Sequence, residues 1–199
     1  MVPEAARIER TWTGATFRRT VAPPPVEVPL ALYVALIDAP DVVAAAARRL
    51  GVATETVAAL GDGGWEVRST KGSRAKYRVL LSAPDRRVVL SHGHVMVLGL
   101  AIPGSVLGVL ELDDRTTSVD QRLTVHARVE HAAWALVAKF LLAFLPSLAD
   151  AELARGFRIT AAVAGWAARE PADFCAWLAS SGVASPRIAT AAACPMAGR

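Results

Sequence analysis

The sequence has only two cysteines, Cys175 and Cys194, and both lie near its carboxyl end. It contains no second pair of cysteines, no CxxC motif and no histidine at the spacing of a zinc site. These absences argue against a disulfide framework and against a structural zinc site. We therefore expect both cysteines to be free thiols, either buried or located in a terminal tail.

Long runs of apolar residues and of positive charge are also missing. The longest apolar stretch, residues 132–145, is broken by Lys139 and ends at Pro146, whereas a membrane span needs roughly 18 or more predominantly apolar residues. The net charge is +4, but the basic residues occur as scattered pairs such as Arg18-Arg19, without interleaved aromatic residues. The sequence therefore predicts neither a membrane span nor nucleic acid as a partner.

Several common motifs are absent as well. No GxSxG, Walker-type or GxGxxG pattern occurs, so the usual hydrolase, NTPase and dinucleotide-binding classes lose their support. Glu4 and Glu9 lie where a secretory signal would have its apolar core, which predicts a cytoplasmic location. The 199 residues suit one domain with a complete core. We predict a single domain over residues 1–180 and a flexible tail over residues 181–199.

The amino-terminal part combines strand-like and helix-like patterns. Threonine, β-branched and aromatic residues predict a first strand over Arg7–Val21, bent at Gly14. Prolines in residues 22–29 then prevent regular structure. Apolar residues at helical spacing predict a short helix from Leu30, and a second short helix follows and ends at Gly51.

Residues 56–130 read as about six antiparallel strands, because short apolar runs alternate with turn signals. In the last of them, apolar and polar residues alternate, which indicates one buried face and one solvated face. The carboxyl-terminal third is helical. We predict a helix from His131 that is interrupted at Pro146, a second helix over Asp150–Arg169 and a short one after Pro171.

This order of elements resembles the helix-grip fold of the START / Bet v 1-like superfamily, the polyketide cyclase and lipid-transfer group. The resemblance covers roughly residues 7–168 and includes the stretch IPGSVLGVLEL (102–112), followed by an alternating strand and a helix rich in Trp, Leu and Phe. It implies an α+β fold: a curved antiparallel sheet of six or seven strands on a long C-terminal helix, with extra helical segments and an internal cavity. The group is defined by shape, so no catalytic motif carries over.

Two histidines stand one residue apart in the stretch LSHGHVMV (90–97). On a strand, His92 and His94 share one face with Leu90 and Met96. This face carries the larger apolar residues, so it is the better candidate for facing a cavity. The histidines could be ordinary sheet residues, polar groups of a ligand pocket or two ligands of a metal. Because no third ligand follows at a suitable spacing, we predict no metal and no other cofactor.

The leading hypothesis is that the protein binds or transports a hydrophobic small molecule, such as a lipid, a polyketide or an aromatic compound. The predicted ligand-binding residues are Trp65, Tyr77, His92, His94, Met96 and Trp134, although the aromatic ones could equally fill the core. One alternative is a cyclase-like or dehydratase-like enzyme that uses a pocket histidine as acid or base. The other is an interaction module whose C-terminal helices dock a protein or make peripheral membrane contact. The sequence makes no prediction of the oligomeric state.

Overall fold

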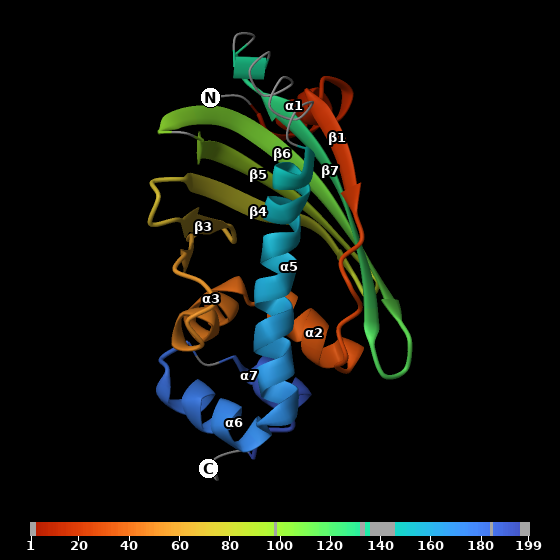
Figure 1. Cartoon of the computed structure of the whole chain (residues 1–199), viewed down its shortest axis with the longest axis vertical. Helices are drawn as coiled ribbons and strands as arrows, with labels where there is room; N and C mark the ends of the chain where they lie inside the picture. Colours follow the sequence, from red (N-terminus) through yellow and green to blue (C-terminus); the bar gives the residue numbers. More distant parts are fainter. Residues whose placement is uncertain (1–2, 98, 132–133, 136–145, 184, 196–199) are drawn as a thin grey trace.

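The computed structural model describes residues 3–97, 99–131, 134–135, 146–183 and 185–195. In these residues one antiparallel sheet curves around a long helix, and shorter helices gather at the far end of that helix (Figure 1). The predicted α+β, helix-grip architecture is confirmed.

Seven strands build the sheet, within the predicted six or seven. They are β1 (Phe17–Val21), β2 (Thr56–Ala59), β3 (Trp65–Arg68), β4 (Arg74–Ala83), β5 (Arg86–Val97), β6 (Leu100–Asp114) and β7 (Val119–Val129). Their order is β1-β7-β6-β5-β4-β3-β2, and all neighbours are antiparallel. Strands β2 to β7 therefore follow one another as a meander, and β1 joins the sheet beside the last of them.

The described helices lie on both sides of this sheet. They are α1 (Glu4–Thr13), α2 (Leu30–Ile37), α3 (Pro40–Arg49), α5 (Pro146–Arg169), α6 (Pro171–Ser180) and α7 (Pro186–Ala191). The first half of α5 lies across the concave face of the sheet, and its second half runs down among α2, α3, α6 and α7 (Figure 1). An ion pair of 3.0 Å between Arg19 of β1 and Asp150 of α5 ties the upper end of the helix to the sheet.

The most deeply buried part of the core lies among the helices. Each of the five helices in this cluster contributes at least one fully buried side chain, namely Tyr33, Leu36, Val42, Val163, Phe174 and Ile188. Tyr33 also donates a hydrogen bond of 2.6 Å to Oε1 of Gln121 on β7. The C-terminal half of α5 is thus held by packing, and this packing positions its first half over the sheet.

The predicted first strand is wrong in its amino-terminal half, because residues 4–13 form α1. This helix has Glu4 in its first turn and Arg10 in its last turn, as the helix dipole favours. It lies on the outer face of the sheet: the Thr11 and Ser105 hydroxyls are 3.0 Å apart, and the Trp12 ring stacks on His126 at 4.1 Å. The aromatic and threonine side chains that suggested a strand therefore make contacts with the sheet instead.

The prediction for the carboxyl end is also corrected. Cys175 and Cys194 form a disulfide, so they are not free thiols. Residues 185–195, predicted as part of a flexible tail, contain α7, whose first turn is capped by the Ser185 side chain. Ile188 of α7 is fully buried against the helical cluster. The buried Ile188 and the disulfide both anchor this segment.

The predicted helix from His131 is described only in part. Trp134 and Ala135 are helical, but residues 136–145 of the predicted first helix lie outside the described residues. Pro146, predicted to interrupt the helix, is the first described residue of α5. The predicted helix over Asp150–Arg169 lies within α5.

Candidate ligand-binding site

A cavity of about 200 Å³ lies between the end of α2 and the concave face of the sheet. Strands β4 to β7 all contribute to its walls. It is lined by Ile37, Asp38, Tyr77, Val79, Arg87, Val89, Gly108, Leu110 and Leu123. Most of this lining is aliphatic, so the cavity is suited to an apolar molecule.

The strand register explains why these residues share a face. Val79 stands opposite Val89, Val89 opposite Gly108, and Gly108 opposite Val125. Gly108 leaves a gap in this row because it has no side chain. A Cβ atom at this position would lie 3.5 Å from Cδ1 of Leu123, which is an ordinary van der Waals distance. The space above Gly108 would therefore accept a methyl group without a clash.

A buried ion pair forms the polar end of the cavity. Nε and Nη2 of Arg87 donate to the two carboxylate oxygens of Asp38 at 2.8 and 3.1 Å. Nη1 of Arg87 donates to the backbone carbonyls of Ala83 and Arg86. Asp38 is also 3.5 Å from the exposed guanidinium of Arg187. All three nitrogens of Arg87 therefore donate, through four of its five N–H groups, and the charge of Arg87 is balanced by that of Asp38.

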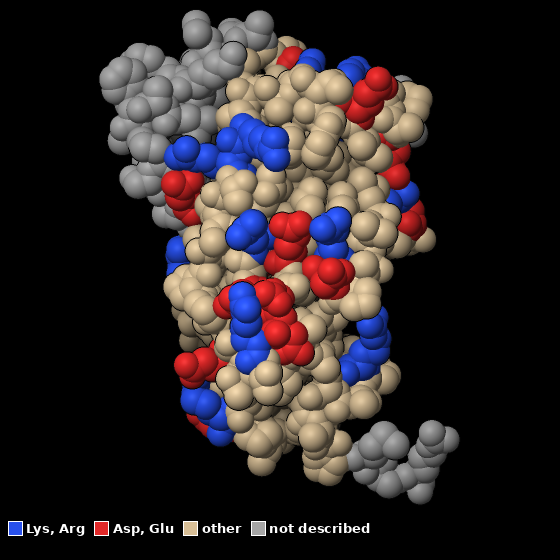
Figure 2. Space-filling view, turned by 90° about the vertical axis from the view of Figure 1, so that its right-hand side faces the viewer, with Lys and Arg blue, Asp and Glu red and all other residues tan. Residues whose placement is uncertain are grey.

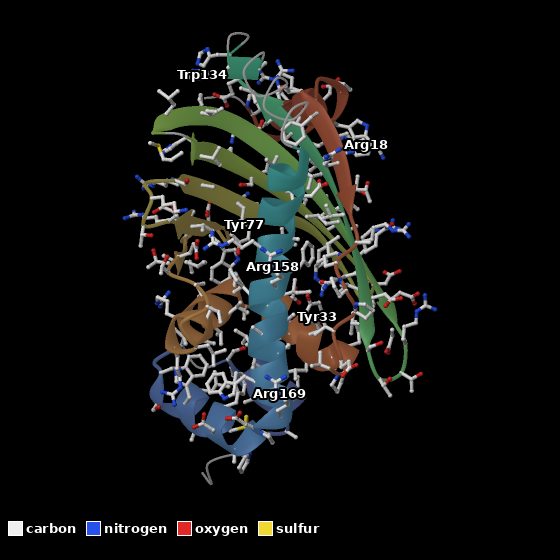
Figure 3. All side chains as sticks on the ribbon, viewed as in Figure 1. Arg18, Tyr33, Tyr77, Trp134, Arg158 and Arg169 are labelled. Atoms are coloured by element: carbon white, nitrogen blue, oxygen red, sulfur yellow. A yellow bond between two sulfur atoms is a disulfide. The ribbon has the colours of Figure 1, made fainter. Side chains whose placement is uncertain are left out.

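Tyr77 is the other lining residue with a polar side-chain atom. It lies on the side of the sheet that faces α5 (Figure 3). Burial raises the pKa of Tyr77, and the nearby Asp41 carboxylate raises it further, so the side chain stays a neutral phenol. Among the described residues the Tyr77 hydroxyl has no hydrogen-bond partner, which leaves it able to donate to a bound molecule.

Only one of the six predicted ligand-binding residues lines this cavity, and it is Tyr77. Trp65 stands opposite Tyr77 in the register of β3 and β4 and shares its face, but it lies beyond the lining. Trp134 lies at the end of the sheet, well away from Tyr77 (Figure 3). The structure therefore brings Trp65 and Tyr77 together and separates them from Trp134.

The face chosen for the histidines is wrong for this cavity. His92 pairs with Ser105, which contacts α1, so His92, His94 and Met96 lie on the outer face. Nε2 of His94 is 3.0 Å from the backbone carbonyl of Gly72. The sequence argument failed because α1, read as a strand, covers the outer face, so both faces carry large apolar residues. No group of three metal-binding side chains occurs in the part of the chain that the structure describes.

Sequence reasoning missed Asp38, Arg87 and Gly108. The available signal was the strand alternation, since Arg87 shares a face with Val89 and a charged residue among apolar ones indicates a buried partner. The sequence did not reveal which acid that partner is, because Asp38 lies 49 residues away.

His126 on the outer face gives the protein a pH-dependent stability. Burial lowers its pKa below the usual 6.5, and the charge of Arg18 lowers it further. Its Nε2 has no hydrogen-bond partner within the described part of the chain. As the pH falls below about 6.5, the unfolded chain takes up a proton that the folded chain resists, so the free energy of unfolding falls. We expect His126→Phe, which keeps a ring under Trp12, to reduce this loss between pH 7.5 and 5.5 in urea unfolding.

The matched control is His131→Phe, because His131 is exposed. This variant should show the pH dependence of the unchanged protein. Burial also lowers the pKa of His92, so part of the dependence should survive in His126→Phe. If the loss of stability on acidification is the same with and without His126, the assignment is wrong.

Comparison with one solved structure supports the architecture. A conserved protein from Geobacillus kaustophilus superposes with a TM-score of 0.52, at 13% identity over 75% of this chain and 95% of the other. A protein from Arthrobacter aurescens matches with a TM-score of 0.49 at 10% identity, over 75% of this chain and 87% of the other. Ara h 8.0201 matches with 0.49 at 11% identity, over 75% of this chain and 97% of the other. The likeness is one of fold. No protein-family model and no curated protein matches the sequence.

Proposed function

We propose that the protein binds a small, neutral, predominantly apolar molecule in the cavity beside α2, as a carrier or a sensor. The supporting observation is a largely aliphatic cavity whose lining includes Tyr77, a phenol without a hydrogen-bond partner among the described residues, beside the ion pair of Arg87 and Asp38. The apolar walls supply affinity, and the hydroxyl supplies orientation.

The charge balance favours a neutral ligand. A carboxylate or phosphate would need a cation with several free N–H groups, but four of the five N–H groups of Arg87 already donate. Moving a charged group into this apolar site without a partner would cost several kcal/mol. A ligand with a hydroxyl, ether or carbonyl oxygen toward Tyr77 avoids this cost.

The volume limits the size of the ligand. A cavity of about 200 Å³ is smaller than the roughly 300–1,000 Å³ of pockets for drug-sized molecules. It suits a small ring system or the end of a longer apolar chain. Each 100 Å² of apolar ligand surface removed from water would contribute about 2.5 kcal/mol, which is enough for measurable binding.

The lining favours binding over acid–base catalysis. No histidine is among the lining residues, and the phenol of Tyr77 is a weaker acid than usual because burial raises its pKa. General acid–base catalysis works best with a group whose pKa lies near the working pH. The histidine-dependent enzyme hypothesis therefore has no support at this cavity.

The proposal predicts a specific effect of Tyr77→Phe. With 1-naphthol and naphthalene as probes, this variant should bind 1-naphthol about five- to tenfold more weakly, since one buried hydrogen bond contributes about 1 kcal/mol. It should bind naphthalene as before. Isothermal titration calorimetry measures both affinities.

The only other tyrosine provides the control. Tyr33 is buried, but its hydroxyl is bonded to Gln121 and it does not line the cavity. Tyr33→Phe should therefore leave the 1-naphthol affinity unchanged in the folded protein. Absence of binding by both probes, or equal weakening of both by Tyr77→Phe, would overturn the proposal.

A further inference from the structure

The hairpin of β5 and β6 extends beyond the rest of the sheet. On one side, pairing with β4 ends at Arg74 and His94, and on the other side pairing with β7 ends at Gly104 and Val129. The pairs from Val95 with Ile102 onward have no flanking strand among the described residues. The end of the hairpin is thus a two-stranded ribbon. Such ribbons are marginally stable in water by themselves.

This ribbon is apolar and uncharged. From Val88 to Leu110, a stretch of 23 residues, the sequence has no Asp, Glu, Lys or Arg. Val95 and Leu100 near the tip are 54% and 49% exposed, and Gly99 and Ala101 are exposed as well. Large exposed apolar side chains clustered on a projecting element indicate a binding surface more than a stable water-facing one.

A basic turn lies beside the ribbon. Nε2 of His94 contacts the carbonyl of Gly72, and the amide of Met96 donates to the Ser73 hydroxyl, so the turn between β3 and β4 is held against β5. In Figure 1 both project from the same side of the sheet. The turn and its flanks carry four cations and one acid, namely Arg68, Lys71, Arg74, Lys76 and Glu66.

The charges here differ from those on the face shown in Figure 2. Glu66 pairs with Arg68 and Arg74, while Lys71 and Lys76 are exposed and have no ion pair among the described residues. On the face shown in Figure 2, the right-hand side of Figure 1, acidic and basic side chains are intermixed over most of the surface. The positive excess next to exposed apolar residues therefore differs from the charge pattern of the face in Figure 2.

We propose that the tip of the β5–β6 hairpin docks on an anionic lipid surface. Val95 and Leu100 would enter the boundary between headgroups and acyl chains, and Lys71 and Lys76 would lie near the lipid phosphates. The ribbon would stay at headgroup level, because its outer strand edges carry backbone groups that need water or headgroup partners. Docking does not depend on whether the cavity beside α2 holds a ligand.

This contact would be peripheral. No single helix among the described residues is long and apolar enough to cross a membrane. Only the helix pair α2 and α3, bent by 97°, has the combined length and apolar composition of a membrane span. A second copy of the chain could instead cover the exposed ribbon edge. Pairing of two copies would either place two positively charged turns side by side or leave both turns without an acidic partner. The charge complementarity favours the anionic lipid.

Vesicle co-sedimentation tests the proposal with the full chain. Vesicles of phosphatidylcholine mixed with phosphatidylserine should bind the protein, and vesicles of phosphatidylcholine alone should bind it much less. Lys71→Glu should weaken binding about fivefold or more, and Leu100→Ser roughly tenfold. Raised salt should weaken binding further, because it screens the exposed charges.

Two controls match these variants. Leu81→Ser alters a leucine of similar exposure, 48%, near the opposite end of β4, and Arg122→Glu makes the same charge change at an exposed site on β7. Both should bind as the unchanged protein does. Equal binding to neutral vesicles, no binding, or equal loss in the controls would overturn the proposal. So would a dimer in analytical ultracentrifugation that Leu100→Ser dissociates.

Discussion

Asp38→Ala is expected to lower the free energy of unfolding by about 3–5 kcal/mol, the cost of removing one partner of a buried ion pair. The Arg87 side chain is only 4% exposed and the Asp38 side chain 15%. Without Asp38, two of the nitrogens of Arg87 lose their acceptors in a place that water reaches poorly. Urea unfolding at neutral pH measures the loss.

The protein contains a natural control on the neighbouring residue. Arg86 pairs with Glu111 at 3.1 Å, but both side chains are about half exposed. Glu111→Ala should therefore cost less than about 1 kcal/mol. The double variant Asp38→Ala with Arg87→Met should recover much of the loss, because no unpaired charge remains. Similar losses for Asp38→Ala and Glu111→Ala would show that the Arg87 pair is not buried as described.

Loss of the disulfide is expected to have the second-largest effect. The double variant Cys175→Ser with Cys194→Ser opens a loop with a sequence separation of 19, which should lower the free energy of unfolding by about 3 kcal/mol in the loop-entropy account. The loop contains the end of α6 and all of α7, so the released segment includes the buried Ile188. Hydrogen exchange should rise first at the amides of α7.

Reduction of the unchanged protein provides the control. Dithiothreitol should lower its stability to that of the double variant and should leave the double variant unaffected. No change on reduction would mean that the bond contributes nothing to the fold. Disulfides are rare in reducing compartments, so the bond weighs against the predicted cytoplasmic location, which stays a prediction.

The sheet could be predicted from sequence because strand signals are local. Alternation of apolar and polar residues in β7 and turn residues between the strands gave the meander and the number of strands. The role of residues 4–13 could not be predicted in this way. Ile8, Thr11 and Trp12 fit a strand by composition, and only the presence of the outer sheet face makes a helix the better solution.

The site was harder to predict than the fold. Choosing a face for His92 and His94 required knowing that α1 covers the outer side. Pairing Arg87 with Asp38, or Cys175 with Cys194, required contacts that no local pattern encodes. Tyr77 was found because a large aromatic residue on a half-buried strand is a reasonable pocket candidate under several arrangements.

The most direct test of the account follows the methyl groups of the cavity by NMR while 1-naphthol is added. The account predicts saturable shifts at Val79, Val89, Leu110 and Leu123, and their loss in Gly108→Val, which fills the gap in that row. Gly156→Ala, at an exposed position of α5 with open space around it, should leave them intact. Shifts confined to the exposed Val52, Val95 and Leu100, or shifts that survive in Gly108→Val, would contradict it.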